Sequence, residues 1–359
     1  MTSRGLIAVC SCLMGVLCAN GTTGPSQAVS PNLTLTAVDG LKVGHFTLGA
    51  RPTGCTVILA APNSVGSVDV RGAAPGTRET DRLTPISDPT NVSAIVLSGG
   101  SAFGLDVAPG VMKWLDERRI NHAAGDAGVV PVVPSAVLID LWFGGSPRVR
   151  PDADCGYRAA QNASGAPVEE GNVGAGAGAT IGKFLGRSGA MKAGIGSSAI
   201  ELQNGLVVAA MVAVNAMGDI VDPQTGHVIA GARSAAGGLA DVRKLLRSGQ
   251  PSPGGGGNTT IGVVATNARL SSVQAKQVAQ MAHDGYARAI SPVHTLVDGD
   301  TIFSLATGTW DGDADAGRIG ALAAEAMAEA IVRAAVQARP SHGLPSASDL
   351  GTVPERFRK

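Results

Sequence analysis

Two neighbouring residues, Asn258 and Thr259, stand where a run of four glycines at 254–257 gives way to a β-branched segment. A threonine hydroxyl is a poor nucleophile at neutral pH unless a base accepts its proton, and an N-terminal threonine carries that base in its own α-amine. An unperturbed α-amine titrates at about 7.7–8.0, so a useful neutral fraction exists at physiological pH. A cut between Asn258 and Thr259 would therefore create both halves of a catalytic unit at once.

Two carboxylates could serve such a nucleophile. Asp298 and Asp300 flank Gly299, and in a turn around this glycine their side chains would converge on one point. There they could orient the hydroxyl or the amine of Thr259 and hold a positive charge that develops on it. An ordinary hairpin turn accounts for the Asp-Gly-Asp sequence as well. A polar entry to a hairpin likewise accounts for Asn258 and the threonines, so both interpretations stay open on these residues alone.

Ser101 offers a rival nucleophile. It lies in a tight turn between an expected strand and an expected helix, which is the arrangement of the nucleophile elbow in α/β hydrolases. That elbow needs a glycine two residues after the serine, where this chain has Phe103. The simpler interpretation is that Gly99, Gly100 and Gly104 allow the backbone to pack closely.

Three other patterns resemble binding motifs without meeting them. Residues 171–183 lack the glycine and the hydroxyl that a P-loop needs around its final Gly-Lys pair, and they lack the third glycine of a dinucleotide fold. Asp311, Asp313 and Asp315 resemble the start of a calcium loop, but Ala316 replaces its glycine and Leu322 its terminal carboxylate. His283 and His294 have no partners at a recognised metal-ligand spacing. We therefore expect no cofactor and no metal, and structural roles for these residues.

The elements that must position the candidate residues follow from hydrophobic runs and their boundaries. Residues 260–266 should form a strand directly after Thr259, and residues 206–214 should form a strand that ends at Asn215. The preceding segment, 230–257, becomes rich in Ser, Pro and Gly and is the clearest candidate for a flexible loop.

Elsewhere the chain alternates short apolar runs with turn residues. Alternating runs predict strands in 33–43, and the glycines and arginines of 65–80 indicate a structured loop. We further expect strands at 54–59, 94–97 and 302–306, and helices at 105–118, 271–286 and 317–337.

Composition limits the kind of partner. The 359 residues include 28 Lys and Arg against 28 Asp and Glu, and a net charge near zero argues against a nucleic-acid binder or a polybasic membrane surface. A peptide or another small molecule is the expected partner. Aromatic residues make up only 3% of the chain and glycines number 50, so the core must be built from small aliphatic side chains packed close to the backbone.

The first 31 residues differ from the rest. Arg4 precedes an apolar segment at 6–19 and a polar linker at 20–31, which predicts a secretory signal and hence a periplasmic or secreted protein. A buried helix or a mis-set start codon is the alternative for this segment, and a cytoplasmic location is the alternative for the protein. No other segment is long enough to span a membrane. Three of the five cysteines fall in this segment. The remaining two, Cys55 and Cys155, are too few for a disulfide framework and form no metal-ligand spacing.

Several motifs together resemble the L-aminopeptidase/D-esterase family of self-processing hydrolases, which includes β-peptidyl aminopeptidases and the nylon-oligomer endo-hydrolase. The resemblance runs in order from about residue 33 to residue 337. It implies an α/β (α+β) fold, a four-layered αββα sandwich like that of N-terminal-nucleophile hydrolases. It also implies a precursor cut at 258/259 into two subunits and a homo-oligomer of the cleaved units. The matching segments are 98–105, 174–178, 258–261, 264–267 and 298–301.

The resemblance assigns roles residue by residue. Thr259 matches the nucleophile, and Asp298 and Asp300 match the carboxylates beside it. Lys183 and Asn215 match supporting residues, with Asn215 as a donor to the oxyanion, a role in which one hydrogen bond can be worth about 3–4 kcal/mol.

One position departs from the family pattern. Ile139 stands where relatives carry a tyrosine near the active site, which bears on rate and substrate preference rather than on the family. The sequence therefore predicts one hydrolase domain at 32–339, followed by a loose tail at 340–359, that hydrolyses peptide or amide bonds through an acyl-enzyme. A Ser101-dependent α/β hydrolase and a catalytically silent binding protein of the same fold are the alternatives.

Overall fold

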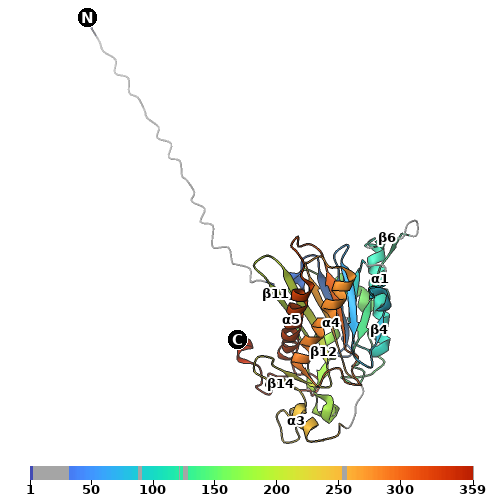
Figure 1. Cartoon of the computed structure of the whole chain (residues 1–359), viewed down its shortest axis with the longest axis vertical. Coiled ribbons are helices and arrows are strands. Elements are labelled where there is room, and N and C mark those ends of the chain that lie inside the picture. Colours follow the sequence, from blue (N-terminus) through green and yellow to red (C-terminus); the bar gives the residue numbers. More distant parts are fainter. Residues whose placement is uncertain (3–31, 88–90, 121, 124–127, 253–256, 359) are drawn as a thin grey trace. The chain divides into compact units, whose positions relative to one another are not determined.

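A computed structural model gives the fold and describes residues 1–2, 32–87, 91–120, 122–123, 128–252 and 257–358 (Figure 1). The expected signal segment and the glycines at 254–256 lie outside the described residues, so the predictions made for them stay predictions. Asn32–Lys359 forms one unit, separate from Met1–Pro31, and the description below concerns that unit.

Two five-stranded sheets form its centre. In each sheet one neighbouring pair is parallel, β5 with β8 and β15 with β17, and the other pairs are antiparallel. In order across the first sheet the strands are β1 Lys42–Thr47, β2 Gly54–Leu59, β5 Ala94–Ser98, β8 Ser135–Val137 and β4 Thr77–Arg78. Across the second sheet they are β11 Ile195–Glu201, β12 Val207–Asn215, β15 Thr259–Thr266, β17 Thr301–Ala306 and β3 Val65–Val70.

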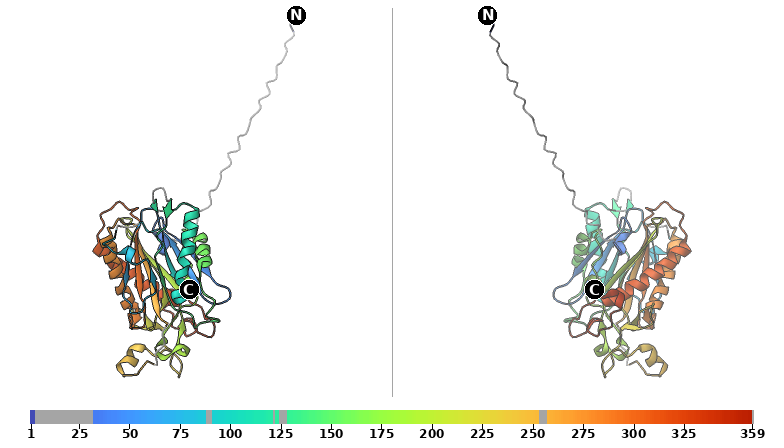
Figure 2. Two further views of the ribbon diagram at one scale, coloured as in Figure 1. Left: turned by 90° about the vertical axis from the view of Figure 1, so that its right-hand side faces the viewer. Right: turned by 90° about the vertical axis from the view of Figure 1, so that its left-hand side faces the viewer.

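Helices cover the outer face of each sheet. Helices α1 (Val107–Glu117) and α2 (Ala153–Gln161) pack on the first sheet, and α4 (Ser272–Ala289) and α5 (Ala316–Val336) pack on the second. Figure 2 shows α4 and α5 on one flank, α1 on the other, and the sheets between them. The predicted four-layered αββα sandwich is confirmed.

The central strands consist of nearly continuous apolar residues because both of their faces are buried. In β12 every second side chain from Val207 to Ala213 packs between the sheets, and the others pack against α5. Small residues bring the layers together: a Cβ on Gly196 of β11 would lie 2.0 Å from the Ala330 carbonyl oxygen of α5. The glycine and alanine content noted in the sequence therefore serves close packing of helix on sheet.

Short elements complete the unit. The shorter strands are β6 His122–Ala123, β7 Val129–Val130, β9 Thr180–Ile181, β10 Met191–Lys192, β13 Asp219–Val221, β14 Val228–Ala230 and β16 Ile290–Ser291. Besides α3 (Val242–Arg247), the chain has 3-10 turns at Leu35–Ala37, Asp81–Leu83, Ser101–Asp106, Gly174–Gly176, Lys183–Leu185, Arg187–Gly189 and Glu355–Phe357.

Four segments differ from the sequence-based expectation. The expected loop at 65–80 contains β3 and β4, and most of the expected strand region at 33–43 precedes β1. The tail after residue 340 is not loose, because Ser346 and Ala347 are fully buried and Lys192 N donates to the Pro345 carbonyl oxygen at 2.8 Å. The expected flexible loop at 230–257 contains α3.

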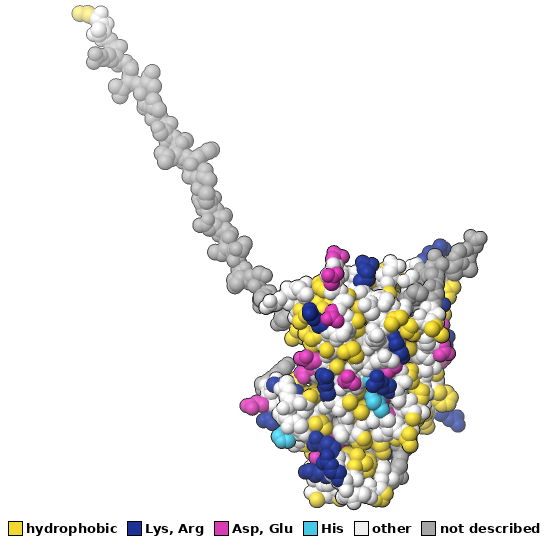
Figure 3. Space-filling view, viewed as in Figure 1, with side chains coloured by type: hydrophobic (Ala, Val, Ile, Leu, Met, Phe, Trp, Pro, Cys, Tyr) yellow, Lys and Arg dark blue, Asp and Glu magenta, His cyan; other side chains and the backbone are white. Residues whose placement is uncertain are grey.

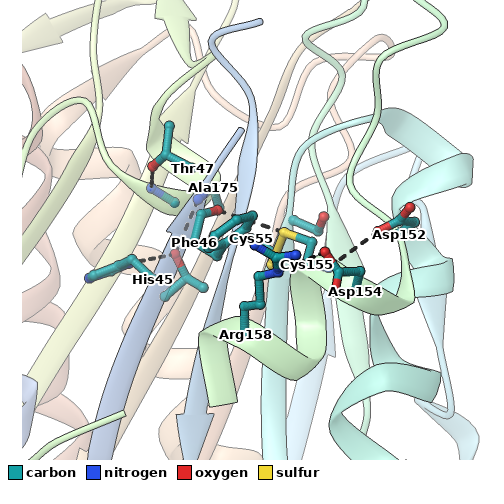
Figure 4. Close-up of a disulfide and its surroundings, with 12 residues drawn as sticks. His45, Phe46, Thr47, Cys55, Asp152, Asp154, Cys155, Arg158 and Ala175 are labelled. Carbon is teal, nitrogen blue, oxygen red and sulfur yellow. Dashed lines mark hydrogen bonds and ion pairs between the residues drawn. A yellow bond between two sulfur atoms is a disulfide. The ribbon is translucent and has the colours of Figure 1, made fainter. Parts of the chain in front are cut away.

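Cys55 of β2 and Cys155 of α2 form a disulfide that ties the first sheet to its covering helix (Figure 4). Their Cα atoms are 6.3 Å apart, a usual separation for bridged cysteines, and 100 residues separate them in the chain. The two cysteines do not form a disulfide framework, as expected, but they form one cross-link between the first sheet and α2.

The surface carries no dominant charge on the face shown in Figure 3, where acidic and basic side chains are interspersed among neutral and hydrophobic ones. Among the described residues, no helix combines the length and the apolar character that a membrane span requires.

Candidate active site

Thr259 is the first residue of β15, the central strand of the second sheet. Its side chain is buried, and its Oγ1 accepts a hydrogen bond from the Gly299 N–H at 3.2 Å. In the antiparallel pairing of β12 with β15, Asn215 lies directly opposite Thr259. The end of β12, the start of β15 and the turn before β17 thus meet at this hydroxyl.

The Asn215 side chain is held at both ends. Its Nδ2 donates to the carbonyl oxygens of Gly257 at 3.2 Å and Ile139 at 3.1 Å. Its Oδ1 accepts from the Thr180 N–H at 3.0 Å and from Lys183 Nζ at 2.9 Å. A fully bonded amide has one orientation, so its N–H groups are fixed in direction beside the Asn258–Thr259 bond.

Lys183 is buried beneath this amide. Its Nζ also donates to the Thr180 carbonyl oxygen at 2.8 Å and to the Asn215 carbonyl oxygen at 3.0 Å. Burial lowers the pKa of Lys183 to about 7, and the carboxylate of Asp298 acts against that shift. The backbone reaches this place through Gly182, whose φ of 69° and close approach to Gly231 leave no room for a side chain.

Asp298 directly precedes Gly299, whose N–H binds Thr259, and it has one oxygen bonded and one free. It accepts from the N–H of Thr295 at 3.1 Å and from the Thr295 hydroxyl. Its Oδ1 is buried and has no hydrogen-bond partner among the described residues. Burial, and then the neighbouring Asp300, raise the pKa of Asp298. A buried acceptor without a partner is suited to receive a donor that arrives later.

Asp300 has both oxygens engaged. Oδ1 accepts from the Thr260 N–H at 2.8 Å, and Oδ2 accepts from the His294 N–H at 3.1 Å and lies 2.8 Å from His294 Nδ1. Asp300 therefore fixes the backbone directly after Thr259. The two aspartates lie on either side of Gly299, where a Cβ would lie 2.8 Å from Thr259 Oγ1.

The structure adds site residues that sequence reasoning missed. Thr180 and Thr295 hold Asn215 and Asp298 in place, and His294, for which the sequence predicts an ordinary structural role, contacts Asp300. Thr295 could have been found from the sequence, because it lies three residues before Asp298 and such side chains commonly form local hydrogen bonds. Thr180 had no comparable signal, because its partner is 35 residues away.

A cavity of about 280 Å³ opens at Thr259. The Asn258 side chain is buried in its wall, and both polar atoms of that side chain lack a hydrogen-bond partner among the described residues. Gly257, with φ 123°, brings the chain to this point, and a Cβ there would lie 2.9 Å from Ile139. The other lining residues include Ser101, Ala102, Ile139, Leu296 and Val297.

Ser101 lies in the same cavity but lacks the partners of a serine nucleophile. No histidine or carboxylate is hydrogen-bonded to its hydroxyl in the described part of the chain. The nearby Asp140 is buried and instead binds Arg51, the Thr53 hydroxyl at 2.6 Å and the Gly100 N–H at 3.0 Å. The geometry and the αββα fold both disfavour an α/β hydrolase based on Ser101.

The glycine run at 174–178 has a packing role. Gly174 N donates to Thr47 Oγ1 at 2.8 Å, and the buried Lys192 donates to the carbonyl oxygens of Gly176 and Ala179 at 2.9 Å each. The 3-10 turn at Gly174–Gly176 also contacts β1 and β2 of the first sheet and β11 and β12 of the second, so the run packs between the two sheets.

The chain is similar in sequence to known peptidases and hydrolases. The chain matches the model of peptidase family S58 over residues 34–347. It is 41% identical over 348 residues to an uncharacterised aminopeptidase of Mycobacterium tuberculosis (strain ATCC 25618 / H37Rv), a match that covers 88% of this chain and 97% of the relative. It is 32% identical over 312 residues to the 6-aminohexanoate-oligomer endohydrolase of Paenarthrobacter ureafaciens. This match covers 82% of this chain and 84% of the relative.

A solved structure shows the same fold. The L-aminopeptidase D-Ala-esterase/amidase from Ochrobactrum anthropi, described as a variant of the Ntn hydrolase fold, superposes with a TM-score of 0.66 at 19% identity. The match covers 90% of this chain and 93% of that chain. The predicted likeness to N-terminal-nucleophile hydrolases is thereby confirmed at the level of the fold.

Proposed function

Because the chain belongs to peptidase family S58, we propose that it is a self-processing amidohydrolase whose nucleophile is Thr259. Cleavage of the Asn258–Thr259 bond would release this residue as a new N-terminus. The observation that carries the proposal is the position of Thr259, which begins a central strand, lines a cavity and has Asn215 opposite it.

In maturation, Thr259 Oγ1 attacks the carbonyl carbon of Asn258. The carbon–nitrogen bond breaks as the ester bond forms, and the hydroxyl proton passes to the departing nitrogen, which becomes the α-amine of Thr259. Water then hydrolyses the ester, restores the hydroxyl and leaves a carboxylate on Asn258. The Gly299 N–H supports this step by holding Oγ1 in place. The unpaired amide of Asn258 supports departure of the cut end, because an unsatisfied buried polar group costs about 1–3 kcal/mol.

In turnover, the α-amine of Thr259 accepts the hydroxyl proton as Oγ1 attacks an amide carbonyl, and it returns that proton to the leaving amine. Water then cleaves the acyl-enzyme. Asn215 Nδ2, which binds the Gly257 carbonyl oxygen in the uncut chain, becomes available to the oxyanion once that segment withdraws. Removing one such donor typically lowers kcat by about 100-fold to 1000-fold.

The charged residues act around this centre. The free Oδ1 of Asp298 is the acceptor for the ammonium form of the Thr259 α-amine. Lys183 and Asp300 are positioning residues: Lys183 fixes the Asn215 amide, and Asp300 fixes the backbone at Thr260. No step in this scheme calls for a cofactor.

The substrates we propose are short peptides or amide oligomers, since the cavity is small and one relative is named for hydrolysis of 6-aminohexanoate oligomers. Ile139 gives the cavity an apolar wall in place of the family tyrosine, while its carbonyl oxygen still binds Asn215. We also propose a homo-oligomer of cleaved units and export from the cytoplasm; the disulfide supports export, because such bonds persist in oxidising compartments.

Three variants test the nucleophile. Thr259→Ala should give an uncut chain without amidase activity, and Thr259→Ser should retain both reactions. Thr260→Val is the matched control, because the buried Thr260 hydroxyl has no partner among the described residues and its loss should be tolerated. Intact mass and a peptide-amide assay read out both steps. Cleavage and hydrolysis by Thr259→Ala would refute the proposal.

A further inference from the structure

A second cavity adjoins the one that holds Thr259. Its volume is about 530 Å³, and its wall includes Arg78, Arg148 and Arg150. Ala102 lines both cavities. Arg78 belongs to β4, which begins directly after Gly76 in the wall of the first cavity. A ligand that extends from the nucleophile along β4 therefore reaches these arginines.

The three guanidinium groups are not paired with a carboxylate of any described residue. None of them forms an ion pair with a carboxylate in the described part of the chain, in contrast to Arg158 and Arg243. A guanidinium without a carboxylate partner retains its full capacity to bind one from a ligand.

Arg150 is also oriented in advance. Its guanidinium carbon lies 3.6 Å from the centroid of the Phe103 ring, and Phe103 is 55% exposed, which is unusual for so large an apolar side chain. Stacking on an aromatic face leaves the planar edge of the guanidinium free for a two-point contact with a carboxylate.

Two aspartates share this cavity and leave it with a net positive charge. Asp152 is engaged elsewhere, because its Oδ1 accepts from the Cys155 N–H at 3.2 Å and caps α2. Asp106 is exposed at the start of α1. Three arginines against two aspartates favour an anionic ligand.

We propose that this cavity binds the terminal carboxylate of the substrate, on the leaving-group side of the bond that is cut. The inference rests on the proposed function. In a peptide or amino-acid oligomer, the free carboxylate always lies on the amine side of each amide bond, so it departs with the leaving group. The substrate class is therefore short peptide acids or oligomeric amino acids with a free carboxylate, in preference to the corresponding esters and amides.

Binding of two probes tests the site without any turnover. The probes are 6-aminohexanoate and 6-aminohexanol, which differ only in the carboxylate and contain no amide bond. Titration calorimetry on the full wild-type protein should show about tenfold tighter binding of the acid, as expected for a charge-assisted pair. In Arg78→Gln and Arg150→Gln this ratio should fall toward one. It should persist in Arg269→Gln, a control at the opposite end of β15.

The outcomes separate the two proposals. Equal affinities in the wild type, no measurable binding of either probe, or a ratio unchanged in both arginine variants would overturn the carboxylate site. A chain that prefers the acid through these arginines but neither cuts itself nor hydrolyses amides would refute the proposed function and leave the site in place.

Discussion

Gly299→Ala tests whether the Thr259 hydroxyl is held where the reaction needs it. A methyl group at this position would lie 2.8 Å from Thr259 Oγ1 and 2.5 Å from the Ala74 carbonyl oxygen. Ordinary van der Waals contact begins at 3.4 Å, so these atoms must move away by about 0.6 and about 0.9 Å. The shift would also break the bond from the Gly299 N–H to the hydroxyl.

A displacement of about 1 Å at a reacting atom can lower a rate by about 100-fold, and we expect the smaller shift of Oγ1 to lower self-cleavage and kcat by up to that factor. Overpacking should also reduce the free energy of unfolding by about 1–3 kcal/mol. The assay follows the two fragments on a denaturing gel after cell-free synthesis, with a thermal melt of the purified protein as a check on folding.

Gly165→Ala is the matched control, because a Cβ at that position would meet nothing within 4 Å and the variant should cut like the wild type. A folded Gly299→Ala protein that cuts itself and hydrolyses amides at wild-type rates would refute the reasoning.

Further predictions concern charge, the cross-link and the rival serine. Burial lowers the pKa of Lys192 to about 7, whereas in the unfolded chain it is about 10.4. Between these two pH values the unfolded state binds more protons than the folded state. The free energy of unfolding therefore rises with pH across that range. In denaturant titrations at several pH values, Lys192→Met should reduce the slope of unfolding free energy against pH by up to about 1.4 kcal/mol per pH unit. An unchanged slope would contradict this prediction. Cys55→Ser should cost about 4–5 kcal/mol of unfolding free energy, as expected for a closed loop of about 100 residues; a denaturation midpoint equal to that of the wild type would argue against the bond. Both cysteines precede residue 258, so the cut fragments should separate on a gel without reductant. Ser101→Ala should keep self-cleavage and hydrolysis, and loss of hydrolysis with cleavage intact would favour the serine alternative.

The fold could be predicted where local signals and burial agree. Strand β2 matches its expected bounds because Gly and Pro residues border a run that is buried throughout. Helix α4 begins where Ser271 and Gln274 form a capping box, which fixes its start through local hydrogen bonds. The strand after Thr259 was likewise evident from its β-branched residues.

The rest depended on partners distant in the chain. Strand β3 has Gly, Ser and Asp among its six residues, and Asp69 is stable there because Lys276 of α4 and Arg71 pair with it. The bond between Cys55 and Cys155 and the contact of Thr180 with Asn215 likewise join distant segments. At the site, residue types in the motifs indicated Thr259 and its aspartates, whereas the positioning contacts became visible only in three dimensions.

The most direct test of the central claim is the N-terminal sequence of the smaller fragment of freshly purified, active protein. We predict that it begins with Thr259 and reads Thr-Thr-Ile-Gly-Val-Val. An intact chain in active protein, or a fragment that begins at any other residue, would contradict Thr259 as the nucleophile.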